Sequence, residues 1–154
     1  MYSKEERKAI HTAYWNRFRS FVSSMRSSSG RKTNWLNYPT RLKEIHVRLD
    51  VNNQRARFSV DIQSTDEGVR ALIWEQFLEL RKVFEKEMKT PGVWSAKEFN
   101  TAGQEICSIY WDLNDVNMYE PKDEKKVFGF FRERLKNFDR FYEEYNEILF
   151  GLIN

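Results

Sequence analysis

The stretch that decides the fold is residues 127–153, VFGFFRERLKNFDRFYEEYNEILFGLI, near the C-terminus. Its apolar side chains recur at alternating spacings of three and four residues, which is the period of one face of an α-helix. The members of this stripe are Phe128, Phe131, Leu135, Phe138, Tyr142, Tyr145, Leu149 and Leu152. The pattern predicts one helix of roughly 30 residues, about 45 Å long at 1.5 Å per residue.

The composition of the stripe indicates what the helix packs against. Most of its members are Phe or Tyr, whereas two-stranded coiled coils favour Ile, Val and Leu at these positions. Val127, Phe141 and Ile148 also widen the apolar surface beyond a narrow seam. We therefore expect this helix to form the spine of the core of its own chain. Any overhang, at residues 150–153, is where self-association would show.

Two further helices are predicted upstream of this spine. The first covers residues 3–26: Ser3 and Glu6 have the spacing of a capping box, and residues 27–30, SSSG, end it. The second covers residues 64–89, with a second capping box at Ser64 to Glu67 and a stop at Thr90-Pro91-Gly92.

Two β-hairpins are predicted between the helices, over residues 43–63 and 93–113. In the first, alternating apolar residues flank Asn52-Asn53, a pair that tolerates the positive φ of a tight turn. A two-residue turn there pairs Val51 with Gln54 and Leu49 with Ala56. It also places Arg48 opposite Arg57, and Asp50 opposite Arg55. The second arm of the other hairpin, residues 104–113, is apolar on both faces, which favours a central strand.

The order of elements predicts an α+β fold in a single domain over residues 1–154. The expected architecture is helix-hairpin-helix-hairpin-helix, with a four-stranded antiparallel sheet packed by three long amphipathic helices. The loop at residues 31–42 carries Trp35, Leu36 and Tyr38, which we expect to pin it to the core.

The composition predicts a chain that folds around its own core and argues against a membrane-spanning or secreted protein. A chain of 154 residues can bury a sizeable core without a disulfide or a metal. Cys107 is the only cysteine and lies in an apolar run, so it is interpreted as a small buried hydrophobe rather than a nucleophile. No apolar run is long enough to cross a membrane, and the N-terminus does not have the pattern of a signal peptide. The expected location is the cytoplasm.

Charge is unevenly distributed along the chain. Residues 1–48 hold 11 Lys or Arg against three Asp or Glu, a net charge of +8, and the remaining residues hold 15 against 20, a net charge of −5. This asymmetry has two interpretations, an anionic partner for the basic part or mutual neutralisation of the two parts in the fold.

The exposed face of the first hairpin is the candidate binding site. Arg48, Arg55 and Arg57, with His46 beside them, form a basic patch that could contact the phosphates of DNA or RNA. Asp50 and Asp61 dilute this patch. No phosphate-binding loop, dinucleotide fingerprint or zinc motif is present, so no catalytic residue, metal ligand or cofactor is predicted. A PD-(D/E)xK nuclease would need an acid-x-Lys on a strand, but the residue two after Asp61 is Gln63.

Three segments carry a resemblance to a known family: Trp15-Asn-Arg-Phe18, residues 77–87 with the sequence FLELRKVFEKE, and Val93-Trp94. With these residues the chain resembles the bacterial domain-of-unknown-function family numbered 4268, over roughly residues 10–152. Members of that family occur alone or at the C-terminus of longer proteins, some with nuclease-like N-terminal parts. The resemblance thus suggests a nucleic-acid or defence context and supplies no catalytic residues.

These observations predict a non-catalytic interaction module whose partner is another protein or a second copy of the chain. One alternative is a nucleic-acid-binding accessory domain of a restriction or defence system. The other is a metal-dependent nuclease-like enzyme.

Overall fold

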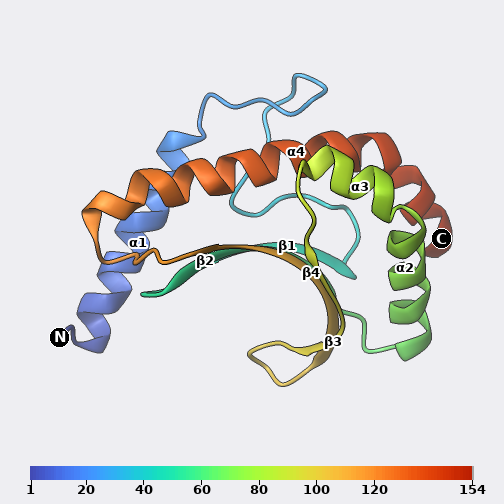
Figure 1. The fold of residues 1–154 in the computed structure, drawn as a ribbon, viewed down its shortest axis with the longest axis horizontal. Coiled ribbons are helices and arrows are strands. Elements are labelled where there is room, and N and C mark those ends of the chain that lie inside the picture. The colour runs from blue at the N-terminus through green and yellow to red at the C-terminus, as the bar shows by residue number, and fades with distance from the viewer. Residues whose placement is uncertain (154) are drawn as a thin grey trace.

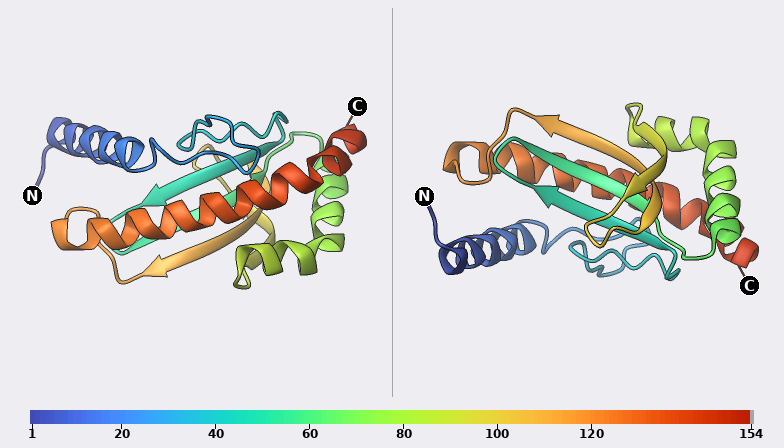
Figure 2. Two further views of the ribbon diagram at one scale, coloured as in Figure 1. Left: turned by 90° about the horizontal axis from the view of Figure 1, so that it is seen from above. Right: turned by 90° about the horizontal axis from the view of Figure 1, so that it is seen from below.

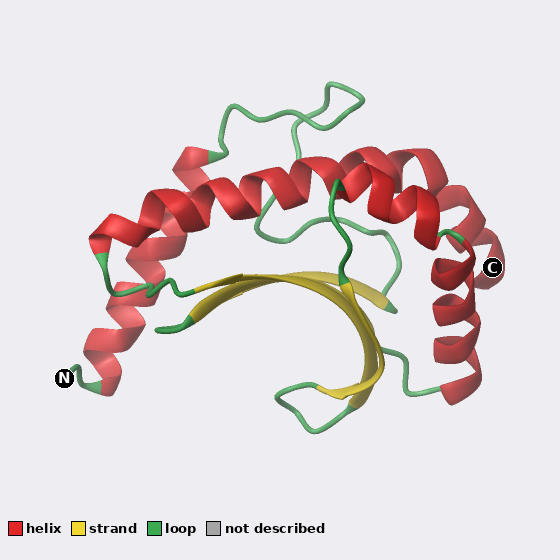
Figure 3. Cartoon of the chain, viewed as in Figure 1, coloured by secondary structure: helices red, strands yellow, loops and turns green. Residues whose placement is uncertain are grey.

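The computed structural model describes residues 1–153, which form four helices and a four-stranded antiparallel sheet, an α+β fold (Figures 1 and 3). The elements in chain order are α1 (Lys4–Phe21), β1 (Ile45–Val51), β2 (Arg55–Ile62), α2 (Glu67–Glu79), α3 (Arg81–Met88), β3 (Val93–Phe99), β4 (Glu105–Asn114) and α4 (Pro121–Ile153).

The sheet has the strand order β1-β2-β4-β3, so β4 is a central strand, as its apolar sequence predicts. The sheet is strongly curved. Helix α4 runs across its convex side, and no helix described lies on its concave side (Figures 1 and 2). Alternate side chains of each strand therefore face either the helices or an open concave surface.

Helix α4 is the predicted spine. It is 33 residues long, and Phe131, Leu135, Phe138 and Leu149 on its stripe are fully buried. The ring of Phe138 lies 6.1 Å from Phe58 on β2, 6.1 Å from Phe84 on α3 and 5.4 Å from Tyr38 in the segment before β1. The predicted anchoring of that segment by Trp35 and Tyr38 is confirmed, since both are buried.

The end of α4 differs from the expectation. Leu152 and Ile153 are partly buried against the core, so residues 150–153 do not form a free overhang for self-association. In Figure 1 this end of the helix lies close to α2.

The prediction of three long helices is wrong, because residues 64–89 form two shorter ones. Helices α2 and α3 meet at Leu80, whose N–H lies 3.1 Å from the carbonyl oxygens of both Gln76 and Phe77. The chain changes direction there, so that α3 lies along α4 (Figures 1 and 2). The bend allows Phe77 and Phe84 to reach the same ring, Phe141, at 6.4 and 4.3 Å.

Two helix boundaries also differ from the prediction. The capping box at Ser3 and Glu6 is confirmed, but α1 ends at Phe21 rather than at residue 26. At the start of α2 the cap is Asp66 instead of Ser64: its carboxylate accepts bonds from the N–H groups of Gly68 and Val69. Asp66 therefore satisfies two amides that the first turn of the helix leaves free.

The register of the first hairpin is shifted by two residues from the prediction. Val51 pairs with Ala56 and Leu49 with Phe58, so the turn is residues 52–55. The side-chain oxygen of Asn52 closes it by accepting bonds from the N–H groups of Gln54 (2.8 Å) and Arg55 (2.9 Å). As a result Arg48 lies opposite Ser59 rather than Arg57, while Asp50 lies opposite Arg57 rather than Arg55.

The second hairpin lies where it was predicted, with one irregularity. Strands β3 and β4 pair in antiparallel fashion, but the register shifts between Ser95 and Glu98, which interrupts the ladder on the β3 edge. Among residues 1–153, no helix combines the length and the apolar character that a membrane crossing requires.

The central position of Phe138 predicts a large loss of stability when its ring is removed. We expect Phe138→Ala to lower the free energy of unfolding by about 3–5 kcal/mol, because the ring is fully buried among aromatic neighbours. The matched control is Ile148→Ala on the same helix, where the side chain is 43% exposed and the expected loss is below about 1 kcal/mol. Denaturant titration of both variants measures the difference, and equal losses would contradict the role of α4 as the spine.

Candidate interaction surface on the concave face

The concave face of the sheet collects the polar side chains of three strands. These are His46, Arg48 and Asp50 of β1, Arg55, Arg57, Ser59 and Asp61 of β2, and Ser108, Tyr110 and Asp112 of β4. A groove of about 550 Å³ runs over this face and is bounded by Glu98 and Phe99 at the end of β3 and by residues 100–102 and 104 of the β3–β4 connection. That connection curls beneath the sheet in Figure 1.

Asp61 anchors the floor of the groove. Its side chain is almost fully buried, and its carboxylate accepts a 2.7 Å bond from the hydroxyl of Ser108 on β4. The other oxygen lies 3.2 Å from Nε of Arg48, which also donates to Gln63. The guanidinium of Arg48 is thus shared between two acceptors of its own chain.

Arg57 is held even more tightly. Its guanidinium donates two parallel bonds to the carboxylate of Asp112, at 2.7 and 2.9 Å, and lies 3.8 Å from the centre of the Tyr110 ring. The hydrogen bond to Asp112 raises the pKa of Arg57 above its ordinary value. Bidentate pairs of this kind fix the orientation of the side chain, so Arg57 is positioned before any ligand arrives.

The structure brings three of the four predicted binding residues into one groove. Arg48, Arg55 and Arg57 all line it, and Arg55 forms a 3.1 Å ion pair with Asp50. His46 is not among the lining residues. Its ring nitrogen lies 2.9 Å from the carbonyl oxygen of Lys43, in the segment before β1.

Sequence reasoning missed the contribution of the second hairpin to this face. Asp112 on β4 and Glu98 on β3 add two carboxylates to this face. Each arginine of the predicted patch therefore has an acidic partner, and Glu98 is a further carboxylate that pairs with none of the three. The predicted basic patch is therefore a surface of paired charges. The alternation of β4 residues places Asp112 on the face opposite Trp111 and gives a signal that could have found it.

The rim of the groove carries an exposed aromatic ring. Phe99, the last residue of β3, is 63% exposed, the largest exposure of any aromatic side chain within residues 1–153. The ammonium of Lys97 lies 5.9 Å from its ring centre. An exposed ring beside a polar groove adds an apolar contact for a ligand.

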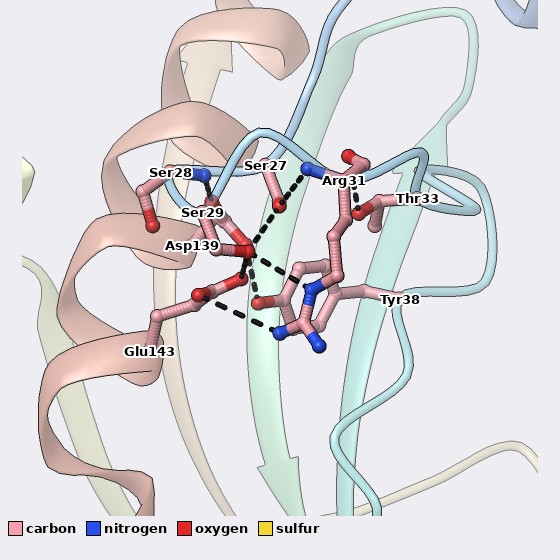
Figure 4. A network of polar contacts seen from close by, with 8 residues as sticks. All are labelled: Ser27, Ser28, Ser29, Arg31, Thr33, Tyr38, Asp139 and Glu143. Carbon is pink, nitrogen blue, oxygen red and sulfur yellow. Dashed lines mark hydrogen bonds and ion pairs between the residues drawn. The ribbon is translucent and has the colours of Figure 1, made fainter.

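A second polar cluster joins the segment before β1 to α4 (Figure 4). The buried carboxylate of Asp139 accepts bonds from the hydroxyl of Tyr38 and the N–H of Ser28, both at 2.7 Å. Burial, together with the bond to Asp139, raises the pKa of Tyr38 far above its ordinary value. Because all three groups satisfy one another, this cluster is interpreted as a structural clamp, which no motif in the sequence indicates.

Potential metal ligands are dispersed over the described residues, and the thiol of Cys107 is buried. Within residues 1–153, no group of three or more His, Cys, Asp or Glu side chains is arranged to hold a metal ion. Cys107 is buried and its thiol donates to the carbonyl oxygen of Ala96 at 3.2 Å. Burial raises the pKa of this thiol.

The clamp predicts a clear difference between two carboxylates of α4. Asp139→Ala leaves the Tyr38 hydroxyl and the Ser28 N–H without their partner, so we expect the free energy of unfolding to fall by about 3 kcal/mol. Glu143→Ala removes only a 3.2 Å bond to Ser29 and a 3.9 Å ion pair to the exposed Arg31, and its expected loss is below about 1 kcal/mol. Denaturant titration compares the two variants, and a larger loss for Glu143→Ala would exclude the clamp.

The environment of Cys107 predicts a thiol that reacts slowly with alkylating reagents. A raised pKa lowers the thiolate fraction at pH 8, and burial blocks access, so alkylation of the native chain should be at least about a hundredfold slower than that of the denatured chain. Time courses with iodoacetamide, with and without denaturant, measure the ratio. Equal rates would show an accessible thiol instead.

Comparison with known proteins places the chain in a family. A family model described as a domain of unknown function, DUF4268, matches residues 10–146. No curated protein and no solved structure matches the chain. Because the family model covers most of the chain, the resemblance carried by Trp15, Phe18 and residues 77–94 is confirmed, and the chain belongs to the DUF4268 family of domains of unknown function.

Proposed function

We propose that this chain is a non-catalytic interaction module that binds an extended segment of another polypeptide on the concave face of its sheet. The observation that carries the proposal is the pairing of charges in the groove. Each of the three groove arginines has a carboxylate partner, at 3.2 Å for Arg48, 3.1 Å for Arg55 and 2.7 Å for Arg57. The groove is therefore polar and rich in hydrogen-bonding groups, yet close to neutral.

A neutral polar groove favours a polypeptide over a nucleic acid. A phosphate backbone gains affinity by contacts with unpaired Lys and Arg, which release counterions. Here the groove arginines already bind Asp61, Asp50 and Asp112, and those carboxylates would repel a phosphate. A peptide offers N–H and C=O groups, charges of both signs and side chains of varied polarity, which matches this lining better.

Two apolar side chains supply the hydrophobic part of such an interface. Phe99 is exposed at the rim, and Ile106 lines the groove beside it. Interfaces typically combine a few aromatic anchors with a polar surround, and most binding energy comes from the anchors. We infer that a bound segment places an apolar side chain against Phe99.

Selection of random-sequence peptides on the immobilised chain tests this proposal. We expect enriched peptides whose affinity falls about tenfold or more for Phe99→Ala, because the variant removes the anchor while the exposed position keeps the fold intact. The matched control is Phe21→Ala, another exposed phenylalanine, on α1 and outside the groove-lining residues, which should leave affinity unchanged.

Two outcomes would contradict the proposal. Peptides that bind the wild type and Phe99→Ala equally would place binding elsewhere. Binding of DNA or RNA probes that weakens steeply with salt and is lost in Arg48→Glu with Arg57→Glu, without any peptide enrichment, would support the nucleic-acid-binding accessory domain instead. Cleavage of such probes with magnesium or manganese would support the nuclease-like enzyme.

A further inference from the structure

The outer edge of β1 is a row of backbone groups without partners. In an antiparallel ladder, facing residues alternate between pairs that exchange hydrogen bonds and pairs that do not. The bonds from Asn52 N–H to the carbonyl of Arg55 (3.0 Å) and from Gln63 N–H to the carbonyl of Glu44 (2.8 Å) fix this alternation at both ends of β1.

The alternation tells which groups of β1 point away from β2. His46, Arg48 and Asp50 bond to β2, so Ile45, Val47, Leu49 and Val51 direct their N–H and C=O groups outward. Ile45 is satisfied by Leu42 and Thr40. Within residues 1–153, the outward groups of Val47, Leu49 and Val51 have no hydrogen-bond partner.

The two edges of the sheet are not equivalent. On β3 the ladder is interrupted between Ser95 and Glu98, and such irregularities discourage pairing with another strand. Strand β1 is continuous over seven residues. The sheet therefore has one edge suited to accept a further strand, more open at Val47 and Leu49 than at Val51, which is 6% exposed.

We propose that β1 pairs in antiparallel fashion with β1 of a second copy of this chain, in a register centred on Leu49. Leu49 then pairs with the partner's Leu49, and Val47 with the partner's Val51, so that the outward N–H and C=O groups of all three residues are satisfied. The outward backbone groups of β1 lie outside the groove, although the side chains of Arg48 and Asp50 also line it, and the inference does not depend on what the groove binds.

The charges of β1 select this register. Centred on Leu49, it places Arg48 opposite the partner's Asp50, and by symmetry Asp50 opposite the partner's Arg48. Both pairs lie at positions where facing side chains are closest. A register centred on Arg48 would instead place Arg48 opposite the partner's Arg48, and these like charges would repel each other. Arg48 and Asp50 already pair with Asp61 and Arg55 in their own chain, and side-chain exposures of 49% and 63% leave both accessible to a partner as well.

The pairing also preserves the two faces of the sheet. Val47, Leu49 and Val51 lie on the face that packs toward the helices, and the first two are only half-buried in a single copy. Because side chains alternate between the two faces along a strand, this apolar row would lie directly beside the same row of the second copy. The two concave faces would meet along β1 and form one longer surface.

Sedimentation and light scattering over a concentration series test the inference. We expect a reversible dimer that Leu49→Pro converts to a monomer, because proline removes only an outward N–H and leaves the bonds of Arg48 and Asp50 to β2 intact. Leu49→Val is the matched control: it keeps the N–H and an apolar side chain, and should keep the dimer. Circular dichroism and thermal unfolding establish that each variant is folded.

Charge exchange tests the register. Arg48→Asp and Asp50→Arg each put like charges opposite one another twice per dimer, so each should raise the dissociation constant about tenfold or more. The double variant R48D/D50R restores both pairs between the copies but puts like charges beside Asp61 and Arg55 within each copy, so we expect it to recover part of the affinity that either single variant loses. A wild type that stays monomeric at the highest concentration, or a dimer unaffected by Leu49→Pro, would overturn the proposal. Peptide binding to the groove by a monomeric wild type would leave the proposed function standing.

Discussion

The packing of aromatic rings along α4 is the constraint on which the rest of the structure depends. Phe138 contacts a strand, a helix and the segment before β1 through Phe58, Phe84 and Tyr38. The Phe84 and Phe141 rings lie 4.3 Å apart, the closest ring pair described within residues 1–153. Such contacts are directional as well as apolar, so one helix fixes the position of three parts of the chain that are distant in sequence.

Burial on one face of the sheet leaves the other face open. Helix α4 and the segment before β1 pack on the convex side, where Phe58, Val60 and Ile109 are fully buried. The strands must then present polar residues on the concave side, and the pleat does so with Arg, Asp and Ser. Asp61 and Ser108, which are buried although they face the groove, show that the curvature of the sheet encloses part of this polar layer.

The sequence predicted the features that depend on periodicity and missed those that depend on long-range contacts. The spacing of Phe128 to Leu152 was enough for α4, because it persists over many turns. The register of the first hairpin was missed, since a shift by two residues leaves every side chain on its face and only the Asn52 cap distinguishes the two turns. The bend at Leu80 has no glycine or proline to signal it and follows from the packing of Phe77 and Phe84 around Phe141.

On the candidate surface, too, the sequence predicted what depends on periodicity and missed what depends on long-range contacts. The residues Arg48, Arg55 and Arg57 were found because they alternate on one strand pair. Asp112, the partner of Arg57, was found only in the structure, because the neighbouring strand β4 belongs to the second hairpin and Asp112 lies 55 residues from Arg57 in the chain. A patch judged from one hairpin is basic, whereas the assembled sheet is nearly neutral. The sign of a surface is therefore a property of the tertiary fold.

The same charges explain how an open edge can be selective. Strands at the edge of a sheet commonly carry charged side chains, which oppose pairing with an arbitrary strand. On β1 the opposed charges Arg48 and Asp50 lie on either side of Leu49, the centre of the proposed pairing. An apolar strand from another protein offers neither charge a further partner, while an antiparallel copy of β1 offers each its opposite. Charge order along a single strand can thus exclude most partners and still admit its own copy.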